Sequence, residues 1–223
     1  MDIVTEPSSA FRNASTIPGD QTCFLCFPSP NLLVRQSKST KLIAGLGPIV
    51  ENYCLIASIA HVPSLADLLT TDPAAIEEIV DLRSALQERV GPILLTEHGR
   101  IPVCSDDRGG HEEHCYHAHA LLFPASISIE QEASSYYMKA QAFSSLSKAL
   151  DYARSTENYL LVSPHPARFD ILSGPLNAPR QLVRTLVAHK HDVLERADWR
   201  ICPLAEEALR NAVRLREVFG ASP

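Results

Sequence analysis

The sequence predicts an α+β fold built around an antiparallel sheet. Short apolar segments that read as β-strands alternate with segments of helical spacing. Few connections are long enough to be the crossovers that parallel strands require. The 223 residues suffice for one large domain or for one domain with an extension, and an apolar content of 45% is ordinary for a globular protein.

Most of the expected strands lie in the first half of the chain. Asp72-Pro73 is a typical helix start, with Asp as the N-cap and Pro at the first helical position, and Gly91 ends this helix. Ser64 starts a shorter helix over residues 65–69. Strands are expected over residues 32–36, 41–44, 53–58, 92–96 and 117–124.

The second half is expected to be richer in helices. Residues 159–162 and 168–172 read as two strands that pair with each other. Helices are expected over residues 128–137, 141–154, 179–184 and 204–219. We therefore divide the chain into a disordered arm (1–21), a sheet domain (22–126) and an α/β extension (127–223) that packs on it.

Composition excludes several classes of protein. A net charge of −6 disfavours broad capture of nucleic acid, and no apolar run is long enough to cross a membrane. The N-terminus lacks the pattern of a secretory signal, which indicates a cytoplasmic protein. In a cytoplasmic protein, the six cysteines of the chain are expected to be thiols or metal ligands rather than a disulfide framework.

The densest group of chemically active residues lies just before Pro124. Histidines alternate with alanines there, so His117, His119 and Leu121 are expected on one face of a strand. Two imidazoles side by side suggest a functional site. The alternatives are a polar surface strand, or core histidines hydrogen-bonded to the backbone.

A Cys-x-x-Cys pair, Cys23 and Cys26, lies at the start of the sheet domain. Such a pair is half of a zinc site or a redox pair. Redox pairs of the thioredoxin type open a helix, whereas this one runs into Pro28 and Pro30, which exclude a helix interior. A metal site is therefore favoured.

Taken in order, these motifs resemble the histidine triad (HIT) superfamily of nucleotide hydrolases and transferases. The resemblance rests on the Cys-x-x-Cys pair, on His61 after a central apolar strand, on His98-Gly99 and on the strand that contains His119. A looser match of Gln181-x-x-Arg184 and Trp199-Arg200 resembles the tail of zinc-bearing microbial HIT-like proteins. The resemblance implies a HIT-like antiparallel sheet with packed helices and a helical C-terminal extension.

The resemblance also implies a reaction. His119 takes the position of the nucleophile that attacks the α-phosphate of a nucleotide, in hydrolysis or nucleotidyl transfer. Leu121 stands where the third histidine is expected, and it can neither donate a hydrogen bond nor protonate a leaving group. The galactose-1-phosphate uridylyltransferase branch, to which the chain is distantly similar, also lacks that histidine. Two alternatives are a module that only binds nucleotides and an enzyme for another phosphorylated small molecule.

Other residues acquire roles through the same resemblance. Members of the superfamily commonly dimerise, so a homodimer is expected unless the extension covers the shared surface. A structural zinc is expected on Cys23, Cys26, His61 and His117. The expected substrate-binding residues are His98, Gly109, Gly110, Gln181 and Arg184.

Overall fold

The fold is a single antiparallel sheet with helices on both faces. The computed structural model describes residues 23–100, 117–179 and 181–220. Within them the strand order is β1-β2-β3-β5-β4-β7-β8-β6, with antiparallel neighbours throughout. The strands are β1 (Leu33–Gln36), β2 (Thr40–Ala44), β3 (Cys54–Ser58), β4 (Ile93–Gly99), β5 (His119–Pro124), β6 (Tyr137–Phe143), β7 (Tyr159–His165) and β8 (Arg168–Pro175). The predicted class, α+β with an antiparallel sheet, is confirmed.

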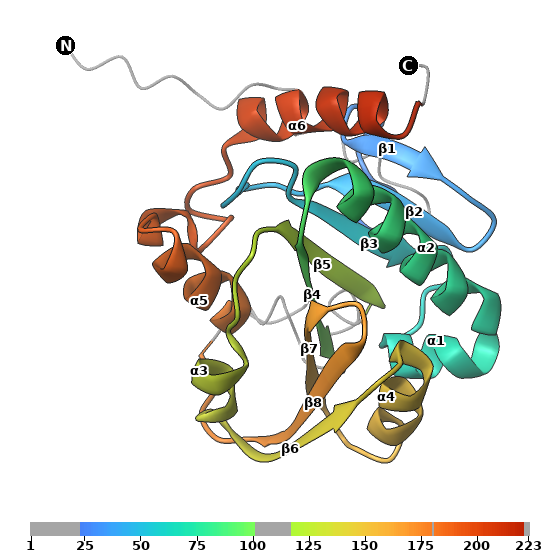
Figure 1. The fold of residues 1–223 in the computed structure, drawn as a ribbon. Coiled ribbons are helices and arrows are strands. Elements are labelled where there is room, and N and C mark those ends of the chain that lie inside the picture. The colour runs from blue at the N-terminus through green and yellow to red at the C-terminus, as the bar shows by residue number, and fades with distance from the viewer. Residues whose placement is uncertain (1–22, 101–116, 180, 221–223) are drawn as a thin grey trace.

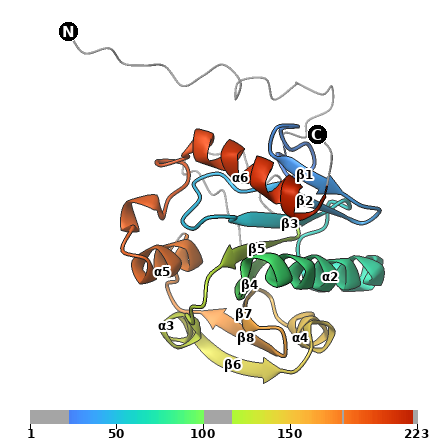
Figure 2. The same cartoon turned by 45° about the horizontal axis from the view of Figure 1, so that its top comes forward.

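The helices form a layer on each side of this sheet (Figure 1). One face is covered by α1 (Leu65–Thr71), α2 (Pro73–Val90) and α4 (Leu146–Ala153); the other by α3 (Glu130–Ser134) and α5 (Leu182–Lys190). We call these the α2 face and the α5 face. A short 3-10 helix, η3 (Leu194–Arg196), leads toward α6 (Ala205–Val218), which packs across β1 and β2 (Figure 2).

Strand alternation divides the buried side chains between the two faces. Ile56, Ala120 and Leu122 pack with α2 and α4 in one apolar cluster. Leu94 and Phe123 pack with α5 in a second cluster. Because His119 and Leu121 alternate with Ala120 and Leu122, they belong to the α5 face.

Several predicted elements of the first half are confirmed. The strands over 32–36, 41–44 and 53–58 appear with boundaries shifted by one residue at most, and α2 begins at Pro73 and ends before Gly91. The β7–β8 pairing expected in the second half is also present. The strand expected from residue 117 begins at His119. The arm predicted over 1–21 lies outside the described residues.

The prediction was wrong between residues 128 and 145. The helix expected over 128–137 is limited to α3, residues 137–143 form strand β6, and the next helix begins only at Leu146. β6 is an edge strand in which residues 138–142 are all exposed, and its Ala, Lys, Gln and Met residues also favour a helix. Ser145 caps α4 by accepting a hydrogen bond from the Lys148 N–H, which fixes the helix start.

The sheet is continuous across the predicted boundary at residue 126. β4, from the first half, pairs with β7, from the extension, over five residue pairs. The extension therefore occupies the β4 edge, and β1 and β6 are the outer strands. Among the helices of the described ranges, none combines the length and apolarity needed to cross a bilayer.

Candidate metal centre and histidine site

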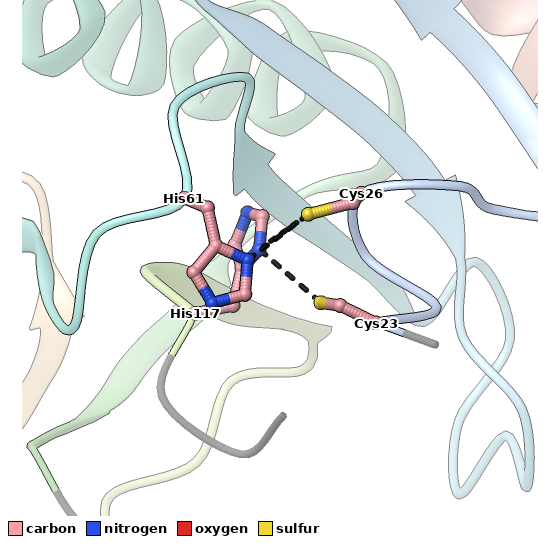
Figure 3. A group of neighbouring side chains, drawn as sticks. All are labelled: Cys23, Cys26, His61 and His117. Atoms are coloured by element: carbon pink, nitrogen blue, oxygen red, sulfur yellow. Dashed lines mark hydrogen bonds between the residues drawn. The ribbon is translucent and has the colours of Figure 1, made fainter. Parts of the chain in front are cut away.

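Three separate segments bring two thiols and two imidazoles together (Figure 3). Cys23 and Cys26 come from the turn before β1, His61 follows β3, and His117 precedes β5. The four potential ligand atoms lie within 4.8 Å of one another. Cys23 and His117 are buried, whereas His61 is exposed, so the cluster lies at the edge of the fold.

The spacing of these atoms fits a tetrahedral ion. His61 Nδ1 lies 3.0 Å from Cys26 Sγ, and His117 Nδ1 lies 3.4 Å from Cys23 Sγ and 3.5 Å from Cys26 Sγ. At usual bond lengths, a sulfur and a nitrogen bound to one tetrahedral zinc are about 3.5 Å apart. The four residues could thus hold a metal ion without a large rearrangement.

A backbone carbonyl sets the tautomer of His117. Its Nε2 lies 2.9 Å from the carbonyl oxygen of Ser58, which can only accept a hydrogen bond. Nε2 must therefore carry the proton, and Nδ1 is left free toward the two sulfurs. A hydrogen bond from the distal ring nitrogen to a carbonyl is the usual support of a metal-binding histidine.

The thiols need a cation to become ligands. Burial and the neighbouring Cys23 raise the pKa of Cys26 to about 11, so without a cation this thiol stays protonated at neutral pH. A bound divalent ion would supply the charge that deprotonates it. Lys41 braces the same turn, since its buried ammonium group donates to the carbonyls of Leu25 (3.2 Å) and Cys26 (2.5 Å).

His119 has the opposite tautomer to His117. Its Nδ1 lies 2.6 Å from the carbonyl oxygen of His117, so Nδ1 is the protonated nitrogen and Nε2 keeps its lone pair. Burial lowers the pKa of His119, which favours the neutral ring. The same short segment thus offers Nδ1 of His117 to the metal cluster and Nε2 of His119 to a reaction.

His98 and Leu121 are the neighbours of His119 on the α5 face. Thr96 pairs with Leu121 in the β4–β5 ladder, and extending this register by two residues places His98 opposite His119. Burial, with a smaller contribution from His119, lowers the pKa of His98 to about 4. Leu121 packs against both apolar clusters. The structure therefore gives His119 one neutral imidazole and one apolar side chain as neighbours.

The remaining predicted substrate residues are not brought to this site by any contact between described residues. Gly109 and Gly110 lie outside the described residues. Gln181 has a left-handed backbone (φ 59°) at the start of α5. Arg184 is buried and donates to the carbonyls of Gly47, Arg196 and Ala197, which is a packing role. Substrate contacts by these residues stay predictions.

Sequence reasoning missed a buried carboxylate beside the site. Glu97 accepts hydrogen bonds from the Leu65 N–H at 2.6 Å and from the Tyr159 hydroxyl at 2.7 Å. It thereby fixes the start of α1, four residues after His61. The sequence signal for this carboxyl group was an acidic residue shortly after the apolar start of a strand. Its two hydrogen-bond partners, Leu65 and Tyr159, are distant in sequence and could not be inferred.

Comparison with known proteins returned no assignment. No family model matches the chain, and no curated protein sequence matches it. The class of site is therefore defined by geometry alone. It is a Cys₂His₂ cluster next to a strand in which one imidazole nitrogen, Nε2 of His119, is unprotonated.

Proposed function

We propose that this protein is a HIT-like nucleotide hydrolase or nucleotidyltransferase in which His119 attacks the α-phosphate. The observation that supports it is the hydrogen bond from His119 Nδ1–H to the His117 carbonyl, which leaves Nε2 unprotonated. An oriented, neutral imidazole is a competent nucleophile near neutral pH. A cytosolic location is part of the proposal.

The reaction would proceed by two displacements. The Nε2 lone pair forms a bond to the α-phosphorus while the bond to the leaving oxygen breaks, and that oxygen takes the electron pair. Water or an acceptor alcohol then attacks the phosphohistidine and releases its proton to the solvent, and the N–P bond electrons return to Nε2. Throughout, Nδ1–H continues to donate to the His117 carbonyl and disperses the positive charge on the ring. Neutral His98 can donate a ring N–H to the phosphate oxygens.

The position of Leu121 favours a second candidate, a module that binds a nucleotide or a specialised small molecule without this chemistry. The apolar side chain of Leu121 lies next to His119 on the same face of the strand. A proton donor at this position would assist the departure of a poor leaving group, and leucine cannot donate a proton. If the chemistry is retained, leaving groups that are stable as anions are favoured. Phosphoanhydrides are therefore preferred over phosphoramidates.

Trapping of the covalent intermediate tests the proposal. The protein is mixed with α-³²P-labelled adenosine and uridine phosphoanhydrides, denatured within seconds, and assayed for an acid-labile, base-stable label. We expect a phosphohistidine in the wild type and a loss of roughly a thousandfold or more in turnover for His119→Asn.

His165→Asn is the matched control, because His165 is exposed at the end of β7. It should label and turn over as the wild type does. Nucleotide binding by calorimetry without label or product would support the binding module instead. Turnover unchanged in His119→Asn would remove His119 from the nucleophile role.

We further propose that the ion in the Cys₂His₂ cluster is zinc, in a structural role. A set of two thiolates and two imidazoles is closed and suits tetrahedral zinc, and it leaves no position for a substrate. The ion would tie the turn at Cys23 to the strand start at His117, and so fix the carbonyl that orients His119.

Metal content checks this assignment. Elemental analysis of purified protein should give about one zinc per chain for the wild type. It should give clearly less for Cys26→Ser. Cys202→Ser is the control, since Cys202 is a half-buried free cysteine outside the cluster, and its zinc content should match the wild type. Equal zinc in Cys26→Ser and the wild type would contradict the assignment.

A further inference from the structure

The sheet contains a repeated unit that its sequence does not reveal. In chain order, β3, α2, β4 and β5 follow one another, and so do β6, α4, β7 and β8. β3, β4 and β5 of the first unit thus correspond to β6, β7 and β8 of the second. In the sheet the strand order of the first unit is β3-β5-β4, and the second unit has the reverse order, β7-β8-β6. The two units are joined by the antiparallel β4–β7 pair. Because α2 and α4 pack on the same face, the two units are related by an approximate twofold axis perpendicular to the sheet.

This axis assigns a counterpart to the histidine site. His119 opens β5 on the α5 face, so the counterpart is the start of β8 on the same face. Arg168 and Asp170 occupy it, since strand alternation puts them on the same side as Leu172, which packs in the α5-face cluster. Neither residue is a histidine, so the second unit lacks the imidazole of the first.

A cavity lies at this counterpart position. It has a volume of about 370 Å³ and is bounded by α3 on one side and by β6 and β8 on the other. Its polar lining is Ser128, Glu130, Gln131, Ser134, Arg168 and Asp170, and its apolar lining is Ala140 and Leu172. The volume is within the range of small-molecule sites. Topology and cavity shape thus point independently to the same place.

The charges of the cavity select against anions. Arg168 Nε donates to Asp170 Oδ2 at 2.9 Å, and Arg168 Nη1 lies 3.9 Å from Glu130 Oε1. Two carboxylates facing one guanidinium leave the wall net negative, so a phosphate would be repelled. The Asp170 side chain is only 8% exposed, and Arg168 engages just one of its oxygens.

The chemistry that suits such a wall is an uncharged ring with hydroxyl groups. A buried carboxylate accepts hydrogen bonds from sugar hydroxyls, as acidic residues do for ribose in dinucleotide sites. Ser128 and Ser134 already donate to Glu130 and to the Gln131 carbonyl, so their hydroxyl oxygens can only accept from a ligand. Ala140 and Leu172 offer apolar contact to a ring face.

We propose that the cavity between α3, β6 and β8 is a second, non-catalytic ligand site for an uncharged, hydroxyl-bearing ring, for which the ribose of a nucleoside is the probe. The proposal does not depend on His119 chemistry. Each chain would then hold one reactive site and one binding site related by the twofold axis of the repeat.

Titration of isotopically labelled protein with adenosine, uridine or inorganic phosphate, followed by NMR, tests this site. We use the His119→Asn variant, so that no reaction occurs at the first site. The nucleosides should shift the amide signals of β6 and β8 around Ala140 and Leu172, and phosphate should not. Asp170→Asn should weaken this binding about tenfold or more, because a charged acceptor is lost.

Two further variants keep the result decisive. Ala140→Leu fills the cavity from an exposed strand position and leaves the Arg168–Asp170 pair intact, so it should also abolish the shifts. Asp151→Asn, at an exposed site on α4, should bind as the parent does. Nucleoside binding that survives both Asp170→Asn and Ala140→Leu, or shifts caused by phosphate alone, would overturn the second site. Shifts at β6 and β8 in this variant, combined with no label on His119 in the wild-type trapping experiment, would instead refute only the proposed catalysis.

Discussion

Replacing Arg184 by Met is expected to lower the free energy of unfolding by about 3–5 kcal/mol. The guanidinium is buried and donates to three carbonyls, at 2.6 Å for Gly47, 2.8 Å for Arg196 and 2.8 Å for Ala197. It also lies over the Tyr53 ring, at 5.2 Å from the centroid. Methionine keeps the apolar stem but leaves three carbonyls without this donor, and each buried polar group left unpaired costs about 1–3 kcal/mol.

Urea denaturation followed by Trp199 fluorescence and by far-UV circular dichroism measures the effect. Trp199 is a suitable reporter because it packs so closely against Gly47 that a side chain there would have no room. Arg154→Met is the control, since Arg154 is half exposed and its ion pair is with exposed Asp151. It should change the free energy of unfolding by less than about 0.5 kcal/mol. A loss below about 1 kcal/mol in Arg184→Met would contradict the structural role.

The Glu97→Gln variant is expected to change how stability depends on pH. Burial raises the pKa of Glu97 to about 8, against the opposing hydrogen bonds from Leu65 and Tyr159. The folded state therefore holds this proton more tightly than the unfolded state. The stabilisation is fully present below the ordinary glutamic acid pKa, about 4.5, and is lost as the pH rises toward 8.

Unfolding free energies of the wild type and Glu97→Gln at pH 5 and pH 8 provide the measurement. Relative to the variant, the wild type should lose about 3–4 kcal/mol over this range, because one retained proton gives about 1.4 kcal/mol per pH unit. Both proteins contain the same buried histidines, so the histidine contributions cancel in the difference.

Glu132→Gln is the control for this comparison. Its hydrogen bond from Lys190 lowers the pKa of Glu132, so this carboxyl is ionised throughout the range in both folded and unfolded states. The profile of Glu132→Gln should therefore run parallel to that of the wild type. A Glu97→Gln profile that also ran parallel would show that Glu97 does not titrate between pH 5 and 8.

Local patterns explain what could be predicted from the sequence. The strand at residues 54–58 is apolar up to Ser58, and Asp72-Pro73 and Gly91 bracket α2, so neighbours in the chain carried the information. The Cys₂His₂ cluster could be predicted because Cys23 and Cys26 form a recognisable pair and because the order of motifs resembled that of a known superfamily.

Long-range pairings explain what could not be predicted. β6 is a strand because β8 pairs with it, and its exposed side chains give no sign of this. The contacts of Arg184 and Glu97 join segments far apart in sequence. The repeated β-α-β-β unit is visible in the strand order.

The pairing of β4 with β7 has a consequence for synthesis. A ribosome releases β4 well before residues 159–165 emerge, so the N-terminal half spends part of translation with an unpaired, largely apolar strand at its margin. Such an edge is a template for pairing with other nascent chains. Expressing residues 22–126 alone would make that transient exposure permanent, and aggregation is the expected outcome. In the complete fold, pairing with β7 of the second unit removes this exposed edge.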